Sequence, residues 1–102
     1  MSIAWEVEGG VAIIRPGQRF DLHSARQFGE VLSRFRELSG MHELRIDLAE
    51  VRYIDSAGLG MLLAAREAAN RANTAVCLTR AHGDARRALD TSGLSRLFAV
   101  IQ

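Results

Sequence analysis

The segment VRYIDSAGLGMLLAA, residues 51–65, decides the fold, because it passes from a strand-like run directly into an uncharged helix. Bulky strand-favouring residues precede Ser56, and most of the residues after it are good helix formers. A serine or aspartate at such a junction is a natural N-cap, since its side-chain oxygen accepts a hydrogen bond from a first-turn amide. Gly58 and Gly60 each cost about 1 kcal/mol relative to alanine inside a helix. We therefore expect another backbone or a ligand to approach this helix start closely.

Composition limits both the architecture and the function. The 102 residues, 48% of them hydrophobic, are enough for one compact domain, which we assign to residues 1–102. The balance of 13 basic against 12 acidic residues gives no sign of a polybasic surface, so we expect no direct binding of nucleic acid. Every basic residue is arginine, which excludes lysine chemistry such as a Schiff base. No uncharged run approaches the ~20 residues of a membrane span, and no signal peptide is recognisable, so we expect a cytoplasmic protein without membrane contact.

The first strands are predicted from alternation. Ile3, Trp5 and Val7 alternate with smaller or acidic residues, as expected of a strand with one buried face. Gly9 and Gly10 interrupt the pattern before residues 11–14 resume it, which predicts an antiparallel hairpin. Further on, apolar residues recur at helical spacing from Leu22 to Leu38, with Asp21 as the expected cap and with Ser39 and Gly40 ending the helix.

The second half of the chain continues the alternation of strands and helices. Residues 43–49 form a strand that places Asp47 on its outward side. Residues 75–78 are wholly apolar and include Cys77, which we read as a buried small hydrophobe in a strand covered on both faces. A short helix over residues 85–89 and a last strand over residues 98–101 follow.

This order of elements predicts an α/β sandwich with a mixed, mostly parallel sheet of four or five strands and helices, opening with an antiparallel hairpin. Asp21 and Ser56 both lie where a strand hands over to a helix. We therefore expect them at the same edge of the sheet, at the carboxyl ends of the strands, where open α/β sheets tend to place their sites.

The residues give little support for catalysis or a metal site. The hydrolase nucleophile elbow needs glycine two residues before and two after its serine, and only Gly58 fits. His23, His42 and His82 have no spacing typical of a general base or a metal site, so we expect no catalytic residues, no metal and no cofactor. Asp21 and Asp55 are better explained as caps than as an acid–base pair.

The motif at Asp55 to Gly60, Asp-Ser-Ala-Gly-Leu-Gly, follows the Asp47-Leu48 pair by seven residues. Together with Phe20-Asp21 at the start of an earlier helix and the late segment 90–98, it resembles the STAS domain of bacterial anti-sigma factor antagonists. The resemblance spans essentially the whole chain. The loop before Phe20 departs from the family pattern, because the family commonly has a shorter loop there and Gly17, Gln18 and Arg19 intervene differently before the Phe-Asp pair.

The resemblance implies that Ser56 is phosphorylated by a cognate anti-sigma factor, which acts as a serine kinase with a histidine-kinase-like ATPase fold. A metal-dependent serine phosphatase reverses the reaction. The unphosphorylated form binds the anti-sigma factor and frees a sigma factor. The residues expected at the partner surface are Asp21, Asp55, Ser56, Gly58, Leu59, Gly60 and Met61. From the helical pattern, Leu59 and Met61 are either covered by the first helix or exposed as a patch for a partner.

Two other classes of function stay open. STAS domains also serve as interaction subunits without phosphorylation, for example in lipid-transport complexes, and Ser56 would then act only as a helix cap. A small hydrolase or nucleotide-binding enzyme is the third class, and turnover or tight ligand binding by the isolated chain would identify it.

Overall fold

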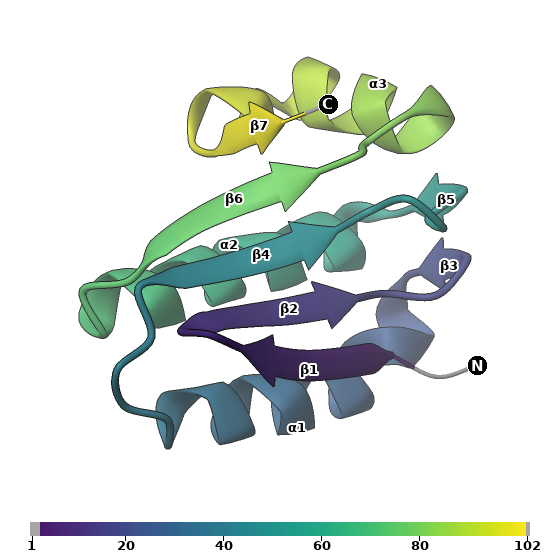
Figure 1. The fold of residues 1–102 in the computed structure, drawn as a ribbon. Helices are drawn as coiled ribbons and strands as arrows, with labels where there is room; N and C mark the ends of the chain where they lie inside the picture. Colours follow the sequence, from purple (N-terminus) through teal and green to yellow (C-terminus); the bar gives the residue numbers. More distant parts are fainter. Residues whose placement is uncertain (1–2, 102) are drawn as a thin grey trace.

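The structure, a computed structural model, describes residues 3–101 and is built on a five-stranded sheet with the order β1-β2-β4-β6-β7 (Figure 1). The strands are β1 (Ala4–Glu8), β2 (Val11–Arg15), β4 (Glu43–Asp47), β6 (Ala75–Thr79) and β7 (Ala99–Ile101). β1 pairs with β2 antiparallel, and the other pairings in this sheet are parallel. The predicted mixed, mostly parallel sheet is therefore confirmed.

The opening hairpin turns at the two glycines, as predicted. Gly9 and Gly10 have φ angles of 57° and 82°, the positive values that a two-residue hairpin turn requires. Trp5 packs half-buried against the core, but Val7 is 43% exposed. The prediction that Val7 is buried was wrong, because it lies next to the turn on the edge strand.

A second, two-stranded sheet pairs β3 (Arg19–Phe20) with β5 (Tyr53–Ile54) in parallel. The sequence pattern marked residues 15–20 only as a connection, and a strand of two residues is too short to show a period. This small sheet ties the entrance of the first helical region to the entrance of the second, and so positions the candidate site.

The helices are α1 (Ala25–Arg36), α2 (Ser56–Arg71) and α3 (Gly83–Ser92), with 3-10 turns η1 (Leu22–Ser24) and η2 (Leu94–Arg96). α1 and α2 pack side by side against one face of the main sheet (Figure 1). α1 ends two residues earlier than predicted, and Gly40, with φ 78°, lies in the following loop. α3 is longer than predicted and ends at Gly93, whose φ of 81° forms a left-handed cap.

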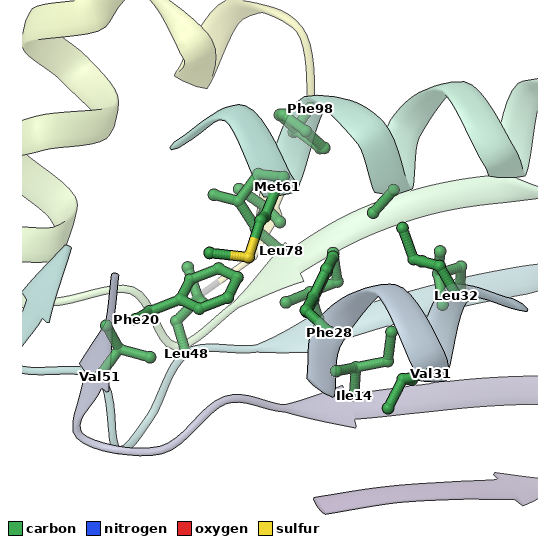
Figure 2. Close-up of a cluster of buried hydrophobic side chains, with 14 of the residues drawn as sticks. Ile14, Phe20, Phe28, Val31, Leu32, Leu48, Val51, Met61, Leu78 and Phe98 are labelled. Atoms are coloured by element: carbon green, nitrogen blue, oxygen red, sulfur yellow. The ribbon is translucent and has the colours of Figure 1, made fainter. Parts of the chain in front are cut away.

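The core lies between this helical layer and the sheet. On β4, Leu44 and Ile46 are completely buried, whereas Glu43 and Arg45 on the other side of the strand are partly exposed. Figure 2 shows Phe20 and Phe28 within the same cluster of buried side chains, and their ring centroids are 5.1 Å apart. Burying such side chains is the main source of stability for a domain of this size.

Across residues 3–101, no helix covers the opposite face of the main sheet (Figure 1). The prediction that β6 is covered on both faces was therefore wrong: Ala75 is exposed. Cys77 is buried as predicted, because the long side chains of neighbouring Glu43 and Arg45 cover it. Asp47 lies on the predicted outward face, but it is only 4% exposed, because Arg15 and Arg80 close over its carboxylate.

Candidate functional site

Helix α2 begins at Ser56, and its N-cap is the preceding residue, Asp55. Asp55 Oδ1 accepts a hydrogen bond from the Gly58 amide, with an oxygen–nitrogen distance of 2.8 Å. A carboxylate in this position also interacts favourably with the positive end of the helix dipole. Since Asp55 provides the cap, the exposed Ser56 is not needed for that purpose. The helix start therefore presents an exposed serine whose hydroxyl group is not required to cap the helix.

Gly58 allows the start of α2 to lie directly against β3. A Cβ atom on this residue would lie 2.2 Å from the carbonyl oxygen of Phe20 and 2.6 Å from Cγ1 of Ile54. The expected close approach of another backbone is therefore confirmed at Gly58. Gly60 is different, because it is exposed and a Cβ there would meet nothing within 4 Å.

Asp21 is the N-cap of η1, immediately before α1, as its position in the sequence predicted. Its Oδ1 accepts a hydrogen bond from the His23 amide at 3.1 Å, and its Oδ2 accepts one from Arg19 Nε at 3.3 Å. The Asp21 amide donates to Ser24 Oγ, which completes a capping box. Only 7% of Asp21 is exposed, so its carboxylate is occupied within the fold.

The pairing of β3 with β5 brings the two helix entrances together. The amide of Leu22, the residue after Asp21, donates to Asp55 Oδ2 at 3.4 Å. The expectation that Asp21 and Ser56 emerge at the same edge of the sheet is therefore confirmed. Both lie beyond the carboxyl ends of the strands, where open α/β sheets place their sites.

The two apolar residues expected at the partner surface differ in burial. Met61 is only 9% exposed, and Figure 2 shows its side chain beside Phe20 in the buried cluster. The structure thus assigns Met61 to the core, so the alternative in which it stands exposed as part of a patch does not hold. Leu59 is half-buried and packs against the core, with part of its side chain left at the surface.

Sequence reasoning missed three exposed apolar side chains around this helix start. Leu22 is 68% exposed, Tyr53 42% and Leu63 39%. The guanidinium of Arg19 stacks over the Tyr53 ring at 4.5 Å. Leu63 lies two helical turns after Ser56 and shares its face of α2, a spacing that the sequence does show.

The outer face of α2 is hollowed next to Ser56. Gly60 has no side chain and lies one turn after Ser56, on the same face. From there a shallow depression of 500 Å³ runs along the helix past Leu63 and Glu67 to Asn70. An exposed serine, a depression and apolar residues thus follow one another along a single surface.

The described residues 3–101 contain no group of three or more histidine, cysteine, aspartate or glutamate side chains that could hold a metal ion. His82 is hydrogen-bonded to the carbonyl oxygen of Ala49 at 2.8 Å, and His23 lies 3.7 Å from the Asp21 carboxylate. Over the same part of the chain, none of the helices has the length and apolar character needed to span a membrane.

Comparison with known proteins agrees with this arrangement. The family model of the STAS domain matches residues 2–102. The anti-sigma-B factor antagonist of Staphylococcus epidermidis is 29% identical over 87 residues, which cover 85% of this chain and 80% of that protein.

Two solved structures have the same fold. An anti-sigma factor antagonist from Mycobacterium paratuberculosis is 25% identical, with a TM-score of 0.84 over 98% of this chain and 84% of that one. The Bacillus cell fate determinant SpoIIAA in its phosphorylated form is 17% identical, with a TM-score of 0.75 over 99% of this chain and 92% of that one. The chain therefore belongs to the STAS domain family.

Proposed function

We propose that this chain is an anti-sigma factor antagonist that works by partner switching in the cytoplasm. Its unphosphorylated form binds a cognate anti-sigma factor and thereby frees a sigma factor. The observation that carries this proposal is the exposed Ser56 at the start of α2, where Asp55 and not Ser56 caps the helix. The Staphylococcus epidermidis relative, which is named as an anti-sigma-B factor antagonist, supports the same activity.

The switch is phosphorylation of Ser56 by the anti-sigma factor, acting as a serine kinase with a histidine-kinase-like ATPase fold. A metal-dependent serine phosphatase removes the phosphate. Two features of this chain support the choice of Ser56: it is exposed, and it stands at the first position of a helix. SpoIIAA, which shares the fold, has been solved in a phosphorylated form.

A phosphate on Ser56 is compatible with the fold. At a helix N-terminus the added charge interacts favourably with the dipole, by about 0.3–1 kcal/mol. The Gly58 amide is already bound by Asp55, however, so that first-turn donor is not available to the phosphate. The phosphate therefore remains near the surface, where its charge of about −1.5 to −2 is available to oppose a partner.

The switch acts on binding. Asp55 already places one negative charge beside Ser56, so a phosphate there concentrates like charge in any interface that covers this region. Burying that charge costs affinity, and each ~1.4 kcal/mol lost is a tenfold weaker complex. A loss of a few kcal/mol is enough to switch the complex off.

The binding surface consists of Ser56 with exposed Leu22, half-buried Leu59 and the depression that begins at Gly60 and reaches Leu63. Asp21 and Gly58 support this surface from beneath. The Asp21 carboxylate is used to cap η1, and Gly58 allows α2 to lie against the backbone of Phe20. Met61 contributes through the core.

Mass spectrometry and calorimetry test the proposal. Incubation with ATP and the candidate anti-sigma factor should add one phosphate to the protein and none to Ser56→Ala. Ser56→Ala should bind the anti-sigma factor constitutively, and Ser56→Asp should bind at least about tenfold more weakly. Ser33→Asp, at an exposed serine on α1, is the matched control and should bind normally. Equal affinities of Ser56→Ala and Ser56→Asp would remove Ser56 from the switch. An interaction subunit without phosphorylation would gain no phosphate under the same conditions.

A further inference from the structure

A hollow of 330 Å³ lies on the face of the main sheet that the helices leave open. Its rim includes the last residues of four adjoining strands: Arg15 of β2, Asp47 of β4, Thr79 of β6 and Ile101 of β7. The register places Asp47 beside Thr79 and Thr79 beside Ile101. Ligands of open α/β sheets bind outside the carboxyl ends of the strands. The hollow extends from the open face of the sheet to this edge, and none of its lining residues belongs to α2.

The lining of this hollow is rich in arginine. Three arginines, Arg15, Arg45 and Arg80, line it together with a single carboxylate, Asp47. Two further carboxylates outside the lining, Glu6 and Glu43, pair with Arg15 and Arg45, so three carboxylates balance the three guanidinium charges. An anion in the hollow would therefore bind to the guanidinium N–H groups that these ion pairs leave free.

Each arginine is held in place through its Nε atom. Arg15 Nε donates to Asp47 Oδ2 at 3.3 Å, and Arg80 Nε donates to Asp47 Oδ1 at 3.0 Å. Arg45 Nε donates to Glu43 Oε2 at 2.8 Å. Within residues 3–101, Nη1 of Arg15 and Nη2 of Arg80 are used in ion pairs, and Nη2 of Arg15 and Nη1 of Arg80 have no side-chain or backbone partner. These planar donors are pre-positioned, which reduces the entropy lost when a ligand binds.

Asp47 holds two of the lining arginines in place, because its carboxylate accepts hydrogen bonds from Arg15 and Arg80. Its burial raises the pKa of its carboxyl group, but the hydrogen bonds from Arg80 and from the Ala49 amide, with the nearby positive charges, together lower the pKa below its usual value. Asp47 therefore stays ionised and holds two guanidiniums. Arg80 is also one of the two non-glycine residues between 3 and 101 with a left-handed backbone, at φ 59°. Such unfavourable backbone conformations cluster at ligand sites.

We propose that this hollow binds a small phosphomonoester that carries an apolar group. A phosphomonoester has a charge of about −1.5 to −2 near neutral pH and three strong acceptor oxygens, which suit guanidinium N–H donors. Guanidinium forks bind phosphate oxygens in pairs, and the Thr79 hydroxyl adds a further polar group at the rim. Ile13 and the half-exposed Ile101 supply apolar walls beside the arginines. This site is separate from the Ser56 surface and does not depend on the proposed switch.

Phenyl phosphate is a suitable probe, because it joins a phosphate to an apolar ring. Titrated into the ¹⁵N-labelled protein, it should shift the backbone amide signals of Ile13, Thr79 and Ile101 and the Nε–H signals of the lining arginines, with a Kd of about 1 mM or tighter. Inorganic phosphate should shift the same signals with weaker affinity, and phenol should leave them unchanged.

Variants separate this site from general electrostatic attraction. Arg80→Gly suits the left-handed backbone at this position and should weaken phenyl phosphate binding at least about tenfold. Arg87→Ala removes the same charge from an exposed ion pair on α3, and Ser56→Ala alters the other surface; both should bind like the unaltered protein. The proposal is overturned if the three variants bind alike, or if phenol causes the same shifts as phenyl phosphate. It is also overturned if phenyl phosphate leaves the amide signals of Ile13, Thr79 and Ile101 in place.

Discussion

Replacing Gly58 by alanine should destabilise the protein, although the same change inside a helix usually stabilises. A Cβ at this position would lie 2.2 Å from the carbonyl oxygen of Phe20 and 2.6 Å from Cγ1 of Ile54. Both contacts are far shorter than van der Waals separation, and one of them is to backbone that no side-chain rotation can clear. Relief requires the start of α2 to move away from β3 by roughly 1 Å, which disrupts close packing.

The size of the effect follows from two opposing contributions. Gly→Ala in a helix gains about 1 kcal/mol in helix propensity. Overpacking costs about 1–3 kcal/mol and occasionally more, and a backbone clash of this size belongs at the upper end of that range. We expect Gly58→Ala to lower the free energy of unfolding by about 2 kcal/mol, equivalent to a fall in Tm of roughly 8–16 °C in a domain of this length.

Gly60→Ala is the matched control, because Gly60 lies two residues further along the same helix and a Cβ added there would meet nothing within 4 Å. It should raise the free energy of unfolding by about 0.5–1 kcal/mol. Urea denaturation monitored by circular dichroism measures both variants. If Gly58→Ala proves as stable as Gly60→Ala, the close approach of α2 to β3 is wrong.

Three further outcomes are expected. Asp55→Ala removes the N-cap of α2 and should cost about 1 kcal/mol in urea denaturation; an unchanged midpoint would show that Asp55 does not act as the cap. Asp47→Asn should lose stability at neutral pH and flatten the pH dependence of unfolding. The lowered pKa of Asp47 means that its contribution is present above about pH 4 and disappears as the pH falls through the folded-state pKa, so a parallel acid profile in wild type and variant would contradict this. Leu22→Ala and Leu63→Ala should each weaken binding of the anti-sigma factor by about tenfold while leaving Tm within a few degrees, and unaltered Kd values would move the interface elsewhere.

Much of the fold could be predicted because its signals are local. The Gly9-Gly10 turn, the alternation of the strands and the capping aspartates each depend on a few neighbouring residues, and the structure retains them. The position of Asp21 and Ser56 at one edge of the sheet could be predicted because both residues lie at a junction between a strand and a helix.

The remaining features depend on contacts between distant parts of the chain. Asp47 is buried by Arg15 and Arg80, which lie more than 30 residues away in either direction, and no periodicity reports such a contact. Met61 could be placed in the core only once the position of Phe20 was known. The pairing of β3 with β5 involves two residues on each side, too few to produce a pattern.

The most direct test compares the phosphorylated and unphosphorylated proteins as ligands of the same anti-sigma factor. Calorimetry should show at least a hundredfold increase in Kd once Ser56 carries a phosphate, corresponding to about 3 kcal/mol of lost binding free energy. The Tm should shift by no more than a few degrees, because the phosphate sits at a helix N-terminus. Equal Kd values for the two forms, or a loss of binding accompanied by unfolding, would contradict the account.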